Sequence, residues 1–167
     1  PTLLLCIGAI AQVAPITSGN LVVYRVGDGA AALGTAAASV FLDEYTITGT
    51  LVQSIALPNA GAAALTAVGN STTEGVISRS QDGNSLVFGG YRAAAATASP
   101  TASSVNRVVG TLGFAGLANT SVAITDITSG NLRSATSVDG SSSFYLGTST
   151  GDRYVGAPSG ASTRALL

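Results

Sequence analysis

The sequence predicts an all-β protein built from four-stranded antiparallel repeat units. Short apolar, β-branched segments alternate with glycine turns along the chain, and one strand–turn–strand pattern occurs twice. Its copies are residues 75–90 (GVISRSQDGNSLVFGG) and residues 133–147 (RSATSVDGSSSFYLG). In each copy a serine precedes an Asp-Gly pair by two residues, and a glycine follows that Asp by eight. Asp-Gly predicts a tight type I′ hairpin turn, in which both central residues have positive φ.

The composition favours a folded domain with a weakly charged surface. Only 9% of the 167 residues are charged and 46% are hydrophobic, whereas an average globular protein has about 25% charged residues. This mixture disfavours intrinsic disorder. The net charge of −1 gives no electrostatic reason to expect nucleic acid or an anionic membrane as a partner.

Residues 1–18 are expected to be distinct from a β-repeat domain at 19–167. They contain an apolar run with the single cysteine, Cys6, so no intrachain disulfide is possible. The run is followed by Gln12 and resembles the second half of a secretory signal peptide, which predicts an extracellular protein and no membrane span. The alternatives are a buried first strand, or a donor strand that is added to another subunit.

The first half of the domain predicts a strand and then a hairpin. Residues 19–29 alternate cleanly between the two faces of a strand. Residues 30–39 are nearly all Ala, Gly and Thr, and we expect a loop or a poorly patterned edge there. Residues 40–57 form a hairpin around a Thr-Gly-Thr turn, and a soft linker at 59–73 leads to the first Asp-Gly hairpin.

The second half repeats this order. A low-complexity loop at 93–104 is followed by a hairpin at 106–127 and by the second Asp-Gly hairpin, and residues 151–155 can begin a third unit. The repeat units are therefore expected at about 40–91 and 106–148. Such units are typical of β-propeller blades, and two of them give only a partial propeller. A Greek-key sandwich or jelly roll is the alternative.

A resemblance rests on three segments: residues 19–29 (GNLVVYRVGDG), residues 40–58 (VFLDEYTITGTLVQSIALP) and the repeated S-x-D-G hairpin. They resemble the first part of a group of secreted, uncharacterised propeller-like proteins known mostly from bacterial genomes. Because members of that group are longer than this chain, the resemblance implies a fragment. It also implies a propeller-like fold and secretion, but no catalytic residues.

Most enzyme chemistry is excluded by the missing residue types. The chain has no His, no Lys and a single Cys, so catalytic triads and His/Cys metal sites are not expected, nor is a cofactor. The adjacent pair Asp43-Glu44 resembles the carboxylates of a glycosidase. Neighbours in a strand point to opposite faces, however, and we expect this pair on an exposed hairpin edge.

Four aspartates stand beside glycine: Asp28, Asp82, Asp139 and Asp152. Calcium binding usually needs several oxygen ligands from one short segment, and each Asp stands alone. Turn chemistry explains all four, because Asp tolerates left-handed backbone and bonds its own main chain. No metal site is therefore predicted.

Two further features concern the surface. Asn70 and Asn119 begin Asn-x-Ser/Thr triplets in expected loops or turns, so they are possible glycosylation acceptors. The five tyrosines are expected to pack within strands, with a sugar-binding aromatic shelf as the alternative; they are Tyr24, Tyr45, Tyr91, Tyr145 and Tyr154.

Three functions remain open from the sequence. The first is a secreted, non-enzymatic β-repeat module that binds a protein or a glycan at the cell surface. The second is a structural subunit of an extracellular filament or layer, which polymerises by β-strand addition and self-associates through sheet edges. The third is a carbohydrate-active enzyme, which needs two converging carboxylates.

Overall fold

The computed structural model describes residues 13–101, 105–127, 129–156 and 163–164. The strands of this part are β1 (Leu21–Val26), β2 (Ala37–Tyr45), β3 (Leu51–Ala56), β4 (Thr66–Val68), β5 (Ser78–Arg79), β6 (Ser85–Tyr91), β7 (Arg107–Gly113), β8 (Ala118–Ile124), β9 (Leu132–Ser137), β10 (Phe144–Thr148), β11 (Gly151–Val155) and β12 (Thr163–Arg164). A single turn of 3-10 helix, η1 (Gly61–Ala63), precedes β4. All strand pairs are antiparallel, so the expected all-β, antiparallel class is confirmed. Cys6 and the expected cleavage site before Gln12 lie outside the described residues.

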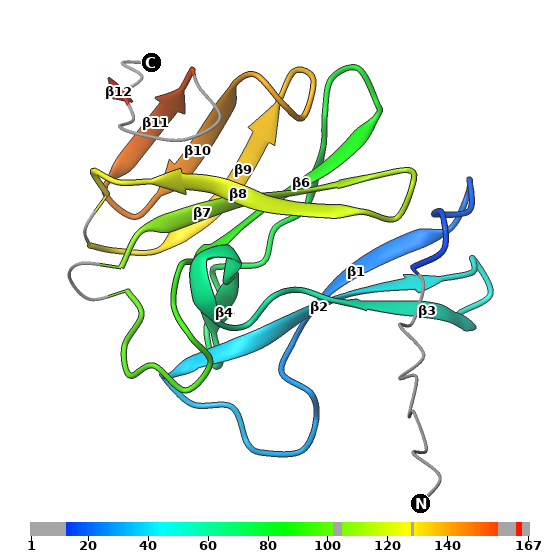
Figure 1. Ribbon diagram of the computed structural model, residues 1–167, viewed down its shortest axis with the longest axis horizontal. Coiled ribbons are helices and arrows are strands. Elements are labelled where there is room, and N and C mark those ends of the chain that lie inside the picture. The colour runs from blue at the N-terminus through cyan, green and yellow to red at the C-terminus, as the bar shows by residue number, and fades with distance from the viewer. Residues whose placement is uncertain (1–12, 102–104, 128, 157–162, 165–167) are drawn as a thin grey trace, which may run out of the picture.

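The strands form three layers, which we call sheets 1, 2 and 3. Sheet 1 contains β1, β2 and β3; sheet 2 contains β4 to β8; sheet 3 contains β9 to β12. Sheets 1 and 2 are continuous because β2 belongs to both: its residues 40–45 pair with β1, and its residues 37–39 pair with β4. Sheet 3 is separate in its hydrogen bonding. Figure 1 shows β1 to β3 on the right and β9 to β12 at the upper left.

Sheet 2 lies in the middle and is buried on both faces. Val87 and Phe88 are consecutive residues of β6, so their side chains point to opposite faces. Val87 belongs to an apolar cluster with Leu132 and Phe144 of sheet 3. Phe88 belongs to a second cluster with Leu42 of sheet 1. Strands β6 and β7 are therefore buried along most of their length.

A glycine in β7 makes room for the second cluster. A Cβ on Gly110 would lie 2.1 Å from Cε2 of Phe88 and 2.8 Å from Cδ1 of Leu65. Both side chains are fully buried. The ring of Phe88 therefore occupies the space that any side chain at position 110 would need.

The predicted hairpins are present. Strand β2 pairs with β3, β5 with β6, β7 with β8, and β9 with β10. The prediction of a type I′ turn at Asp82-Gly83 is wrong, because Gly83 has a φ of 77° while Asp82 does not have a positive φ. Ser80 N instead donates to Ser85 O, which closes a loop of residues 81–84. Asp82 Oδ1 accepts from Asn84 N, and this Asx turn favours the longer loop.

The strands group differently from the expected units. Unit 40–91 joined β2, β3, β5 and β6, but β3 pairs with β2 alone among the described strands, and β6 pairs with β7. Strands β5 to β8 instead form one meander, and β9 to β12 form the next. The low-complexity loop between β6 and β7 allows this pairing because long loops add little closure entropy. Unit 106–148 is divided in the same way, between β8 and β9.

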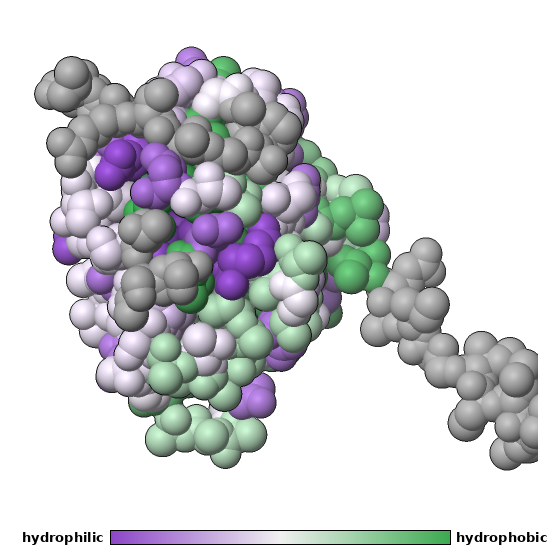
Figure 2. Space-filling view, turned by 60° about the vertical axis from the view of Figure 1, so that its left-hand side comes forward, coloured by the Kyte–Doolittle hydropathy of each residue, from purple (hydrophilic) through white to green (hydrophobic). Residues whose placement is uncertain are grey.

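The surface agrees with the composition. Figure 2 shows mostly pale residues of intermediate hydropathy on this face, with the strongly hydrophilic ones gathered in a few patches. Ser, Thr, Gly and Ala therefore cover much of the surface, as the low share of charged residues predicts.

Candidate functional site

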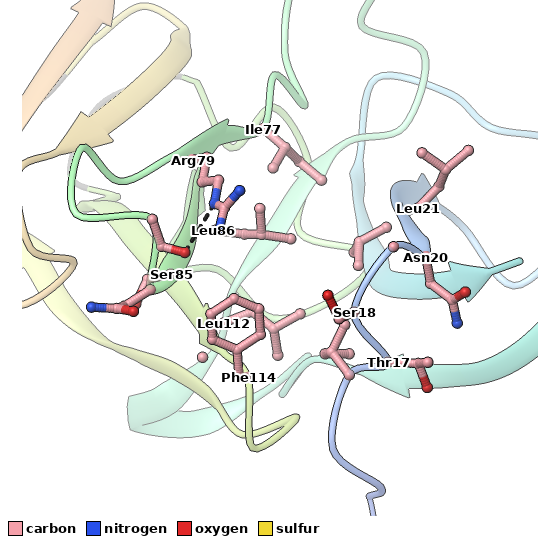
Figure 3. A pocket seen from close by; sticks show the side chains of 16 residues that line it. Thr17, Ser18, Asn20, Leu21, Ile77, Arg79, Ser85, Leu86, Leu112 and Phe114 are labelled. Atoms are coloured by element: carbon pink, nitrogen blue, oxygen red, sulfur yellow. Dashed lines mark hydrogen bonds between the residues drawn. The ribbon is translucent and has the colours of Figure 1, made fainter. Parts of the chain in front are cut away.

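A groove with a volume of about 280 Å³ lies between sheets 1 and 2 at one end of the molecule. Its lining comes from three segments that are distant in the sequence: residues 16–22, the hairpin residues 77, 79 and 83–86, and residues 112–114. Ligand sites typically measure roughly 300–1,000 Å³, so the groove suits a small ligand. Figure 3 shows these side chains facing one another across the opening.

One wall of the groove is a segment without strand structure, which hydrogen bonds hold in place. Ile16 N donates to Phe114 O at 2.8 Å, and Thr17 N donates to Glu44 Oε1 at 2.8 Å. Asn20 Nδ2 donates to the same carboxylate oxygen at 2.6 Å. The segment therefore bridges the β7–β8 hairpin and sheet 1, and Glu44 fixes its path.

The floor of the groove is apolar. Leu86 and Ile77 come from the β5–β6 hairpin, Leu112 from β7 and Val22 from β1, and all four pack on the core shared by sheets 1 and 2. Phe114 stands at the rim, and about half of its surface is exposed. An apolar ligand group in the groove would extend this core, because burial of apolar surface is favourable.

Among the described residues, Arg79 is the one charged side chain that lines the groove. Its Nε donates to Gly83 O at 2.9 Å, which places the guanidinium over the Asp-Gly turn (Figure 3). Its two Nη groups make no hydrogen bond or ion pair with a described residue. They are free to bind an anionic ligand group, for which a guanidinium provides paired donors.

The groove offers polar side chains that can orient a ligand. Among the described residues, its lining contains no carboxylate, thiol or imidazole, the groups that could act as a general base or a nucleophile. The neutral polar side chains are Thr17, Ser18, Asn20, Asn84 and Ser85. They can donate or accept hydrogen bonds and thereby orient a ligand.

Asp43 and Glu44 point to opposite faces of β2, as predicted, but they are not on an exposed edge. Their exposed fractions are 2% and 0%. Asp43 accepts from Arg25 Nε at 2.5 Å and from Ser54 Oγ. Burial raises the pKa of Asp43, but these hydrogen bonds outweigh it, and the pKa lies below its usual value. Both carboxylates thus stabilise sheet 1 and cannot converge on one substrate.

Glu44 is held in the same manner on the other face. Burial raises the pKa of Glu44, but the hydrogen bonds from Gln53, Thr17 and Asn20 lower it by more. The pKa of Glu44 therefore lies below its usual value. An ionised, fully bonded carboxylate has no free proton to donate. The glycosidase hypothesis therefore has no support at this pair.

Turn chemistry accounts for three of the four glycine-flanked aspartates. Asp28 Oδ1 accepts from Ala30 N, and Asp82 and Asp139 accept from backbone N–H groups two residues on. The serine and asparagine bonds around them lower the pKa of both Asp82 and Asp139. Asp152 differs, because it lies within β11 and makes no such bond. Among the described residues, no group of three potential metal ligands occurs.

A buried polar cluster links sheets 2 and 3. Glu74 Oε1 accepts from Tyr91 Oη at 2.5 Å and from Asn131 Nδ2, and Leu132 N donates to Tyr91 Oη. Burial and the Glu74 carboxylate raise the pKa of Tyr91, so its hydroxyl remains a donor. Arg107 lies beside this cluster, fully buried, and its hydrogen bonds go to backbone carbonyls of residues 101, 105 and 130. Since these groups bond to one another, the cluster stabilises the fold and is no binding site.

The remaining surface predictions have mixed outcomes. Asn70 is exposed in a turn, whereas Asn119 is exposed but lies in strand β8 rather than in a loop. Tyr24 and Tyr91 pack in the core, as expected. Tyr145 is 47% exposed and contacts Tyr154, with ring centroids 5.1 Å apart.

No protein-family model matches the chain, and comparisons with curated proteins and with solved structures give no match. Within the described residues, no helix is long and apolar enough to cross a membrane. The sequence did not reveal the groove, because three distant segments form it. The nearest signal was the Asp-Gly turn, which positions Arg79.

Proposed function

We propose that this protein is a non-enzymatic binding module whose ligand occupies the groove between sheets 1 and 2. The observation that carries the proposal is the free guanidinium of Arg79 above an apolar floor. A ligand with an apolar body and one anionic group would satisfy both features. The carboxylates of Asp43, Glu44 and Glu74 accept hydrogen bonds from neighbouring residues, which supports a module without catalysis.

We also propose that the three sheets are consecutive blades of a β-propeller. Three features support it. Strands β1–β3, β5–β8 and β9–β12 each pair as a meander of consecutive strands, the sheets stack in chain order, and related hairpins start the second and third meanders. Further blades would be needed to close a ring, since propellers have four to eight. A secreted, cell-surface location rests on the apolar run at residues 3–11 and stays a prediction.

The test compares an anionic ligand with its neutral analogue. Octanoate and octanol are titrated into the ¹⁵N-labelled protein, and amide shifts report the site and the dissociation constant. We expect R79Q to weaken octanoate binding about fivefold, which corresponds to ~1 kcal/mol for an exposed ion pair. Octanol binding should be unchanged.

The matched control is R133Q, since Arg133 is an exposed arginine on β9 that does not line the groove. R133Q should bind octanoate as the wild type does. Equal effects of R79Q and R133Q would refute the role of Arg79. Octanoate shifts that map outside the groove would refute the site itself.

A further inference from the structure

A second sequence repeat precedes the first strands of sheets 1 and 3. The hexapeptide Ile-Thr-Ser-Gly-Asn-Leu occurs at residues 16–21, where it leads into β1, and at residues 127–132, where it leads into β9. In both places an Asp-Gly pair follows the leucine by seven residues, at Asp28 and Asp139. Leu21 and Leu132 are therefore equivalent positions on the first strands of sheets 1 and 3.

The local contacts of the two copies agree. Asn20 Nδ2 donates to Glu44 Oε1, and Asn131 Nδ2 donates to Glu74 Oε1, so each asparagine bonds a glutamate. The two leucines differ in what covers them. Leu132 is 2% exposed, and Leu21 is 58% exposed.

Leu132 is buried because it fills a gap over a glycine of sheet 2. A Cβ on Gly89 would lie 2.7 Å from Cδ2 and 2.8 Å from Cγ of Leu132. The missing side chain in β6 thus lets a leucine of sheet 3 lie directly on the backbone of sheet 2. This contact is the centre of the interface between the two sheets, where β6 meets β9.

Sheet 3 has an equivalent glycine. Ser80 Oγ donates to Ser85 O in the first Asp-Gly hairpin, and Ser137 Oγ donates to Ser143 O in the second. The Asp-Gly pairs are 139 − 82 = 57 residues apart and these acceptors are 143 − 85 = 58 apart, so the second loop is one residue longer. Counted from the acceptor, Gly147 therefore corresponds to Gly89 rather than to Gly90. Both glycines lie in the second strand of their hairpin.

Gly147 lies on the face of sheet 3 that no other described strand covers, which we call its free face. Phe144 and Leu146 point toward sheet 2, so Tyr145 and Gly147 point away from it. Beside Gly147 is a hollow of about 350 Å³, which we call the Gly147 hollow. Ser134 Oγ lies 2.7 Å from the position of a Cβ on Gly147, so it occupies the space nearest to that glycine. Its lining includes Ser134, Thr136, Tyr145, Gly147 and Asp152.

Leu21 lies on the free face of sheet 1. Val22 and Tyr24 pack on the core shared with sheet 2, so Leu21 and Val23 point away from that core. Leu21 is one of the residues that line the groove, and Figure 3 shows its side chain directed away from the other labelled side chains. Leu51 is exposed as well, and Tyr45 lies between the two leucines, because it pairs with Leu21 on one side and with Leu51 on the other.

The two free faces therefore complement each other in the way that sheets 3 and 2 do inside the molecule. We propose that the free face of sheet 3 binds the free face of sheet 1 of a second copy of this chain, with Leu21 in the Gly147 hollow. The interface between sheets 2 and 3 is its structural precedent. Because the two faces differ, the contact is head-to-tail and generates rings or filaments. Faces rather than sheet edges then mediate self-association.

Sedimentation velocity over a concentration series of the intact chain tests this proposal. We expect concentration-dependent association of the wild type. L21E removes the leucine, and T136E places a charge in the hollow. Each should raise the dissociation constant roughly 100-fold, since an unpaired charge at the centre of an interface is strongly unfavourable. L117E is the matched control, because Leu117 is exposed in the β7–β8 turn, and it should associate like the wild type.

Mixing the two variants gives the most specific result. The L21E copy retains the Gly147 hollow and the T136E copy retains Leu21, so a 1:1 mixture should form a dimer and nothing larger. Near-ultraviolet circular dichroism checks that both variants fold. A wild type that stays monomeric, association that survives L21E, or a mixture that stays monomeric would each overturn the proposal. If the wild type is monomeric, something other than a second copy covers these faces.

Discussion

The glycine at position 110 provides a sharp test of the buried middle sheet. In G110A the new Cβ would lie 2.1 Å from Cε2 of Phe88, whereas ordinary contacts begin at 3.4 Å. The ring would have to retreat by 3.4 − 2.1 = 1.3 Å, and Leu65 blocks the neighbouring space at 2.8 Å. Overpacking of a core costs roughly 1–3 kcal/mol, occasionally more. We expect a value near the upper end, about 3 kcal/mol, because Phe88 is fully buried.

The matched control is G113A in the same strand. Gly113 has no atom within 4 Å of a new Cβ and no positive φ, so alanine should be neutral or slightly stabilising there. Urea unfolding should therefore separate the two variants by about 3 kcal/mol, and thermal unfolding by roughly 6–12 °C. In an F88L background the added cost of G110A should fall below ~1 kcal/mol, since the smaller side chain frees the space. Equal stabilities of G110A and G113A, or an undiminished cost in F88L, would refute this account of the core.

The remaining predictions concern buried polar groups. R25Q should destabilise the protein by ~1 kcal/mol at pH 7, because Arg25 is 38% exposed and its ion pair is partly screened. Burial raises the pKa of Asp43, but Arg25 lowers it overall. This stabilisation is present above the unfolded pKa of about 3.9 and is lost as the pH falls through the folded value. The difference between R25Q and the wild type should thus shrink in urea unfolding at pH 3, and a constant difference would contradict it. Y91F should cost about 1–3 kcal/mol in urea unfolding, because Glu74 loses a buried donor; Y145F, at an exposed hydroxyl, should cost less than ~0.5 kcal/mol, and equal losses would argue against the buried cluster.

Local patterns predicted the hairpins well, because strand alternation and turn residues act over a few positions. Residues 19–29 were expected as a strand, and β1 (Leu21–Val26) lies within them. The Asp-Gly turns lie where expected, but side-chain bonding from Asp82 made the loop longer than a two-residue turn. A dipeptide alone does not reveal that choice, since the loop depends on Ser80 Oγ and Asn84 Nδ2, which both donate to the Asp82 carboxylate.

Grouping of strands into sheets was predicted less well, because it depends on contacts between distant segments. Spacing alone suggested that β3 and β5 belong to one unit, yet the core positions β6 beside β7. The burial of Asp43 and Glu44 was missed for the same reason. Their partners Arg25 and Thr17 are 18 and 27 residues away in the sequence.

The positions of the glycines connect the fold with both proposals. Gly110 and Gly89 lie in adjacent strands of sheet 2, and each admits a large side chain onto the backbone, Phe88 in one case and Leu132 in the other. Two layers can approach so closely where a glycine of one layer faces a large side chain of the other. Gly147 provides a glycine on one free face, and Leu21 provides an exposed large side chain on the free face at the other end of the stack of sheets. Leu21 also belongs to the lining of the groove around Arg79, whereas the Gly147 hollow shares no residue with that groove, so T136E tests self-association without changing the groove.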